Sequence, residues 1–265
     1  MSRVNETHSS YFLRFDCMAN DLDTLLPAAT VVLIRQSNSG LQTLLLRRNS
    51  ALRFAGGNWV FPGGRIDEGD YPDITVTSDF EISSQRPEGE FAAAKVAAVR
   101  ETYEETGLTI DADQLVYLAH WVAPPLMKKR FSTWFFIVKV SEAVADQVEI
   151  DGGEIHESQW LSPTEALASV EDKSMALLPP TIVTVTELVR FDDVDSVIRY
   201  YHDRPPVVFY PRVHVAEADS PSAGQFTFLY QGDAGYQDTN PEVQGPRHRL
   251  NSKEGLWRYE NTVYE

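Results

Sequence analysis

The strongest constraint on this chain is a nine-residue stretch at residues 100–108, RETYEETGL. It predicts the last turns of a helix that Gly107 ends, because glycine readily adopts the left-handed conformation that follows a helix. At 3.6 residues per turn, Glu101, Glu104 and Glu105 lie on one face. Like charges at these spacings destabilise a helix by about 0.2–0.5 kcal/mol per pair, so we expect a cation to neutralise them. Clustered carboxylates suit a hard divalent ion such as Mg²⁺ or Mn²⁺.

The plainer interpretation is three solvated glutamates on an exposed helix. Two features argue against it. The sequence that leads into the glutamates, residues 91–99, is small and apolar (FAAAKVAAV), which indicates close packing. Upstream, an apolar stretch at residues 58–61 runs into a glycine-rich turn at residues 62–70 (PGGRIDEGD). Such a turn lets the backbone approach a metal or a phosphate without interference from Cβ atoms.

Together the turn and the helix resemble the signature of the Nudix hydrolase family. That signature is a glycine, five residues, a glutamate, seven residues, and then Arg-Glu-apolar-x-Glu-Glu-x-Gly-apolar. Gly64 matches the first glycine, and residues 100–108 match the second half. Asp70 stands where the family has glutamate, and Thr102 stands where a bulkier apolar residue is usual. The intervening residues 71–99 number 29 instead of seven, which is an insertion of 22.

We expect the inserted stretch, residues 71–90, to be a surface loop because it is polar, acidic and punctuated by proline. With its interrupted signature, the chain resembles the subgroup of Nudix proteins related to coenzyme A diphosphatases. The spacing Arg53-x3-Gly57-x3-Phe61-Pro-Gly-Gly also resembles the pattern that these enzymes carry just before the signature. The resemblance covers residues 28–195.

The fold class that we predict is α/β (α+β). Apolar runs predict a hairpin at residues 28–35 and 43–46, and further strands at 116–122, 133–140 and 157–161. Helices are expected at residues 90–106, from 163, at 177–191 and at 192–201. Residues 207–215 read as one strand, which Pro211 confines to a sheet edge, and residues 231–265 are expected to wrap the surface.

The resemblance implies a three-layer α/β/α sandwich with a mixed sheet. We therefore divide the chain into an N-terminal extension (1–25), a Nudix hydrolase domain (26–195) and a C-terminal extension packed on it (196–265).

The resemblance also assigns roles at the site. It implies that Glu101, Glu104 and Glu105 bind one to three Mg²⁺ or Mn²⁺ ions, with the carbonyl of Gly63 as a backbone ligand. Arg100, one turn before Glu104, would orient that carboxylate; its ordinary alternative is a helix-surface ion pair.

The catalytic base stays open between Glu101 and a carboxylate from a later loop. Glu154, which follows two glycines, is the best late candidate, and Glu157 is the reserve. An incidental acid in a turn explains Glu154 equally well.

Substrate contacts are expected from basic and aromatic residues. Arg48 or Arg53 could bind a phosphate, such as the 3′-phosphate of coenzyme A, and each could equally be a surface arginine. Arg130 and Phe131 follow two lysines in an otherwise acidic protein, which favours contact with a phosphate or an adenine.

The implied reaction is metal-dependent hydrolysis of a nucleoside diphosphate linked to another moiety. Coenzyme A or acyl-coenzyme A is the first expectation, giving 3′,5′-ADP and (acyl-)4′-phosphopantetheine. The alternatives are ADP-ribose, NADH or a nucleotide sugar as substrate, or a nucleotide-sensing Nudix module without catalysis. RNA decapping is disfavoured because the protein is acidic and its sequence has no basic tract that would bind RNA.

The formal net charge of -16 argues against nucleic-acid or anionic-membrane partners. The single cysteine, Cys17, cannot form an internal disulfide, and no signal peptide is evident, so a cytoplasmic setting is expected. No apolar run reaches the length of a membrane span. The expected partner is a small-molecule nucleotide substrate, and the family resemblance leaves a homodimer open.

Overall fold

The computed structural model describes residues 25–52, 55–72, 89–127, 129–217, 225–253 and 256–264. Several expectations concern residues outside these ranges: the N-terminal extension up to residue 24, most of the insertion (residues 73–88) and Arg53. The parts of the chain that bear the three glutamates and the glycine turn are all described.

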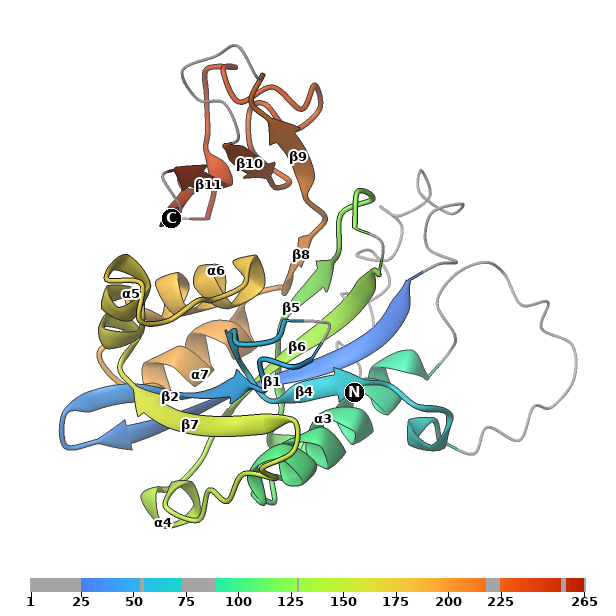
Figure 1. Ribbon diagram of the computed structural model, residues 1–265, viewed down its shortest axis with the longest axis vertical. Helices are drawn as coiled ribbons and strands as arrows, with labels where there is room; N and C mark the ends of the chain where they lie inside the picture. Colours follow the sequence, from blue (N-terminus) through green and yellow to red (C-terminus); the bar gives the residue numbers. More distant parts are fainter. Residues whose placement is uncertain are drawn as a thin grey trace, which may run out of the picture.

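A mixed sheet forms the centre of the molecule, with the strand order β3-β2-β1-β6-β5-β8 (Figure 1). β4 pairs with β1, and β7 pairs with β2. The β1–β6 and β5–β8 pairs are parallel and the others are antiparallel, which confirms the predicted mixed sheet. Its strands are β1 (Leu26–Ser37), β2 (Gly40–Arg48), β3 (Trp59–Val60), β4 (Gly63–Arg65), β5 (Val116–Val122), β6 (Phe131–Lys139), β7 (Ile155–Leu161) and β8 (Val207–Phe209).

Helices cover both faces of this sheet (Figure 1). α3 (Glu90–Thr106) lies on one face, while α6 (Pro179–Leu188) and α7 (Val194–Asp203) lie on the other, with α5 (Pro163–Glu171) against α6. The short helices η1 (Glu68–Asp70), η2 (Ala112–Gln114) and α4 (Glu142–Ala145) lie in connections. This arrangement is the three-layer sandwich that the sequence led us to expect.

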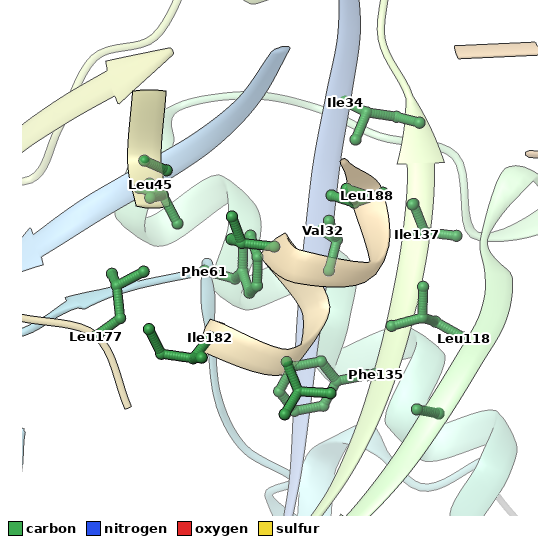
Figure 2. Packing of buried hydrophobic residues seen from close by; sticks show 14 of the residues in the cluster. Val32, Ile34, Leu45, Phe61, Leu118, Phe135, Ile137, Leu177, Ile182 and Leu188 are labelled. Atoms are coloured by element: carbon green, nitrogen blue, oxygen red, sulfur yellow. The ribbon is translucent and has the colours of Figure 1, made fainter. Parts of the chain in front are cut away.

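The middle residues of β1, β2 and β6 are mainly apolar, as expected for strands with both faces buried. In β1, Val31 and Leu33 pack in the cluster that contains α3, whereas Val32 and Ile34 pack in the cluster beneath α6 and α7. Figure 2 shows the cluster beneath α6 and α7, to which Leu188 of α6 and Val32 of β1 both belong. Alternate residues of β1 thus pack against helices on opposite faces of the sheet. This packing fixes the position of α3 relative to β1 and β4.

α3 has the bounds that were predicted for it. Four alanines on its inner face are fully buried, and their small size brings the helix close to the sheet. Gly107 ends it with φ 69° and donates its backbone N–H to the carbonyl of Tyr103. The carboxylate-bearing end of α3 is therefore held in a fixed register against the glycine turn.

Two expectations for the C-terminal part are wrong. Residues 207–215 do not form one strand: they break at Tyr210-Pro211, because proline has no N–H to continue a ladder. β8 stays at the edge of the main sheet, and β9 (Arg212–Val215) begins a second sheet. In place of a surface wrap, β10 (Phe226–Leu229), β11 (His248–Lys253) and β12 (Leu256–Asn261) complete this antiparallel sheet in the order β12-β11-β10-β9.

The second sheet shares a core with the first. Tyr230 and Leu250 are fully buried in the same apolar cluster as Phe209 and α6. Within the described ranges, no helix is both long and apolar enough to cross a membrane.

Candidate functional site

The three glutamates of α3 lie in different environments. Glu105 is buried, Glu101 is largely buried, and Glu104 is 54% exposed. One helix face thus presents a graded row of carboxylates, with its inner end against the glycine turn and its outer end in solvent.

The glycine turn makes close contact with two of these carboxylates. The backbone N–H of Gly63 donates to Oε2 of Glu105 at 3.0 Å. A Cβ atom on Gly64 would collide with the carboxylate of Glu101. β4, which contains both glycines, is anchored by antiparallel pairing with Ala28, Ala29 and Thr30 of β1. The turn therefore positions backbone atoms beside the helix, as expected, although the predicted role of the Gly63 carbonyl as a metal ligand stays a prediction.

Arg100 of α3 connects the helix carboxylates to Asp70 at the end of the glycine turn. Its Nε and Nη2 donate to the two oxygens of Asp70 at 3.0 and 2.8 Å. Its Nη1 donates to Glu101 at 2.7 Å and to Glu104 at 3.2 Å. Asp70 also accepts the Asp67 backbone N–H at 2.8 Å. The guanidinium therefore holds two helix carboxylates in place and is itself fixed by Asp70, a contact that the sequence alone does not reveal.

Burial and hydrogen bonding set the pKa values of these acids. Burial raises the pKa of Glu105 to about 8, although the Gly63 N–H and Arg48 oppose the rise. Burial likewise raises the pKa of Glu101, against the effect of Arg100. Burial alone would raise the pKa of Asp70 too, but hydrogen bonds from Arg100 and the Asp67 N–H outweigh it and lower that pKa. The two buried glutamates thus lie where a further cation would stabilise their ionised forms.

Arg48 lies between Glu154 and Glu105 and contacts both carboxylates. Nη2 of Arg48 is 3.0 Å from Oε2 of Glu154, and Nη1 is 3.7 Å from Oε1 of Glu105. The backbone N–H of Glu154 donates to Asp151, which shapes the loop before β7. Arg48, predicted to bind phosphate, therefore lies between two carboxylates, and Glu157, the reserve base, pairs instead with Arg47.

The remaining predicted substrate residues lie at the β5–β6 connection. Arg130 is buried, and its Nε and Nη2 donate to the carbonyl of Ala123 at 3.1 and 3.0 Å. Lys129 lies over the ring of Phe131, 5.1 Å from its centre. These contacts give Arg130 a structural role in the connection, and its substrate role stays a prediction.

The donor set suits a hard divalent cation, since it consists of carboxylates beside a glycine turn whose missing Cβ leaves room at Glu101. Among the residues that the structure describes, no three Asp, Glu, His or Cys side chains already converge as a metal site. Arg48 and Arg100 contact these carboxylates instead. An ion at these glutamates would therefore share their oxygens with Arg48 and Arg100 or displace the two arginines.

Comparison with known proteins gives consistent results. The sequence model of the NUDIX domain matches residues 24–179. The chain is 22% identical to "Putative nudix hydrolase 7" of Caenorhabditis elegans, over 89% of this chain and 82% of that protein. It is also 22% identical to acyl-coenzyme A diphosphatase NUDT19 of Xenopus laevis, over 64% of this chain and 65% of that protein. A crystal structure of a NUDIX hydrolase from Alicyclobacillus acidocaldarius shares the fold, with a TM-score of 0.55 at 21% identity over 68% of this chain and 98% of that chain.

Proposed function

Because this chain belongs to the Nudix hydrolase family, we propose that it hydrolyses a nucleoside diphosphate linked to another moiety, with Mg²⁺ or Mn²⁺ as cofactor. The observation that carries this proposal is the contact between the glycine turn and α3, where Glu105 accepts the Gly63 N–H. This contact brings the acidic face of α3 beside backbone that can approach a diphosphate closely.

Each side chain has a task in the proposed reaction. Glu101, Glu104 and Glu105 hold the metal, and Arg100, fixed by Asp70, keeps Glu101 and Glu104 in place. When bound, the metal neutralises charge on the diphosphate and lowers the pKa of a bound water. The remaining requirement is a base that takes a proton from the attacking water.

Glu154 is the base that we propose, with Glu101 as the alternative. Glu154 is 61% exposed, so it can accept a proton from solvent-accessible water, and its link to Arg48 keeps it on the side of Glu105. Glu101 is held by Arg100 at 2.7 Å and lies against Gly64, which leaves it less free to move.

For the substrate we propose coenzyme A or acyl-coenzyme A, cleaved to 3′,5′-ADP and (acyl-)4′-phosphopantetheine. The support is the subgroup pattern before the signature and the similarity to acyl-coenzyme A diphosphatase NUDT19. ADP-ribose, NADH or a nucleotide sugar is the alternative, with hydrolysis at the same diphosphate. A nucleotide-sensing module without catalysis is the alternative of another class.

The test is a substrate panel with product identification by mass. Purified protein is incubated with Mg²⁺ or Mn²⁺ and coenzyme A, acyl-coenzyme A, ADP-ribose, NADH or diadenosine polyphosphates. We expect 3′,5′-ADP from the coenzyme A substrates. AMP from ADP-ribose without any turnover of coenzyme A would reject the substrate proposal, and no turnover of any diphosphate with either metal would favour the sensing module.

A further inference from the structure

Arg48 lies at the end of β2, where it can reach both α3 and the loop before β7. The backbone fixes it there, because Asn49 donates its N–H to the carbonyl of Glu154 at 2.8 Å. The side chain of Arg48 is only 17% exposed. Its guanidinium is the group that connects Glu154 to Glu105 in this structure.

The position of Arg48 conflicts with metal binding at Glu105. Oε2 of Glu105 accepts the Gly63 N–H, and Oε1 faces Nη1 of Arg48. The distance of 3.7 Å to Arg48 is longer than a hydrogen bond, so this contact is electrostatic and leaves the oxygen open to a stronger cation. A metal ion that binds Oε1 of Glu105 would therefore compete with Arg48 for this carboxylate and repel the guanidinium.

The hydrogen bonding of Arg48 is also incomplete. Its Nε is buried and has no hydrogen-bond partner within the described part of the chain. A buried donor without a partner is unfavourable. The two carboxylates, rather than a full set of hydrogen bonds, thus keep the guanidinium in this place.

From these contacts we infer that Arg48 is a positioning residue that acts as the internal counter-cation of the metal-free site. It places a positive charge beside Glu105 and pairs with Glu154 near α3, and it gives way when a divalent ion binds. The inference rests on the proposed function, since it concerns the same metal site. Its consequence is that Arg48 stabilises the metal-free protein and weakens metal binding.

The neighbouring residue provides a matched control. Arg47 forms an ion pair with Glu157 at 3.3 Å, but both side chains are exposed, at 51% and 42%. Neither end of this pair contacts Glu105. Replacing Arg47 therefore removes the same charge one residue away, without changing the contacts of the carboxylates at the site.

The test compares Arg48→Gln, Arg48→Lys and Arg47→Gln with the parent, in EDTA and in saturating Mn²⁺, without substrate. We expect Arg48→Gln to lower the melting temperature in EDTA by about 2–4 °C, and Mn²⁺ to remove most of the difference. Calorimetric titration should give Mn²⁺ affinity at least about threefold higher for Arg48→Gln, because a nearby positive charge is lost. Arg48→Lys keeps the charge and should behave like the parent, as should Arg47→Gln.

Three results would overturn the inference. Equal destabilisation of Arg48→Gln in EDTA and in Mn²⁺ would show a purely structural role. Weaker Mn²⁺ binding by Arg48→Gln would show that Arg48 supports the metal site. If Arg48→Gln does not fold, destabilisation of Arg48→Lys in EDTA beyond that of Arg47→Gln would show that the shape of arginine, not its charge, matters. Because none of these measurements uses a substrate, a failed substrate panel would reject the proposed function and leave this result standing.

Discussion

The guanidinium of Arg100 donates two hydrogen bonds to the carboxylate of Asp70, at 3.0 and 2.8 Å. The two residues are 30 positions apart in the sequence, on either side of the insertion. Their pairing links the glycine turn to α3 across the insertion. The shorter side chain of Asp70 is sufficient for this contact because η1 brings it directly to Arg100.

Asp70→Asn is expected to lower the free energy of unfolding by about 2–3 kcal/mol, because the buried carboxylate of Asp70 loses its charge-assisted hydrogen bonds with Arg100. Arg100 keeps Glu101 and Glu104 as partners, which limits the loss. Chemical denaturation in EDTA measures this loss. Glu68→Gln, an exposed change two residues away, is the control and should leave stability unchanged. Equal stability of the two variants would show that the Asp70–Arg100 contact does not hold the signature together.

Gly64→Ala should impair metal binding more than folding. The added Cβ would overlap the carboxylate of Glu101. Because this carboxylate is the end of a side chain, it can swing aside, and it then no longer faces the glycine turn. Gly69→Ala is the matched control, because a Cβ on Gly69 meets nothing within 4 Å. Titration with Mn²⁺ should show weaker binding for Gly64→Ala alone, and an unchanged affinity would argue that Glu101 is not a ligand.

Glu104→Gln is expected to preserve the fold and to reduce diphosphate hydrolysis by at least about tenfold. The side chain is 54% exposed, so its volume contributes little to packing, whereas its charge is required for the metal. Steady-state rates and melting temperature are measured together. Activity close to that of the parent would contradict the metal-site assignment.

Glu105 makes the stability of the metal-free protein dependent on pH. Its pKa is about 8 in the folded protein, against an ordinary value of 4.5 that we take for the unfolded chain. Because the folded state binds the proton more tightly, this contribution to stability is full below pH about 4.5 and is lost as pH rises through about 8. In EDTA, the parent should therefore lose stability between pH 5.5 and 8.5 more steeply than Glu105→Gln, on the order of a few kcal/mol in total.

Denaturant unfolding of both proteins at several pH values checks this prediction. Glu105→Gln has no proton to lose at this position, so the difference between the two curves isolates this one group. Parallel curves would show that Glu105 titrates near its ordinary value.

Asp233→Asn is expected to destabilise the second sheet by about 3 kcal/mol. Asp233 accepts hydrogen bonds from Nε and Nη2 of Arg249 at 2.7 and 2.6 Å, and from the backbone N–H of His248 at 2.8 Å. The variant leaves a buried guanidinium without its counter-charge. Arg258→Gln, which removes an exposed ion pair with Glu171, should change stability by less than about 1 kcal/mol. Chemical denaturation of both variants tests the contrast.

Local patterns in the sequence were sufficient for α3, for the first hairpin and for most strands of the main sheet. Apolar periodicity and the stop at Gly107 depend on neighbours within a few residues, so they can be interpreted without a tertiary structure. The spacing of Glu101, Glu104 and Glu105 likewise places them on one helix face. The change of sheet at Tyr210-Pro211 could not be predicted from the sequence, because Pro211 indicates a sheet edge but not a move from one sheet to another.

The tertiary structure alone decided which of these carboxylates are buried and which cations they contact. The sequence could not show that Glu105 contacts Gly63, 42 residues away, or that Arg48 binds Glu154, 106 residues away. Such contacts depend on how β2, β4 and β7 are arranged around β1, which no local pattern encodes. The sequence thus determined the chemical groups of the site, while the long-range pairing of strands determined their burial, their charge partners and therefore their pKa values.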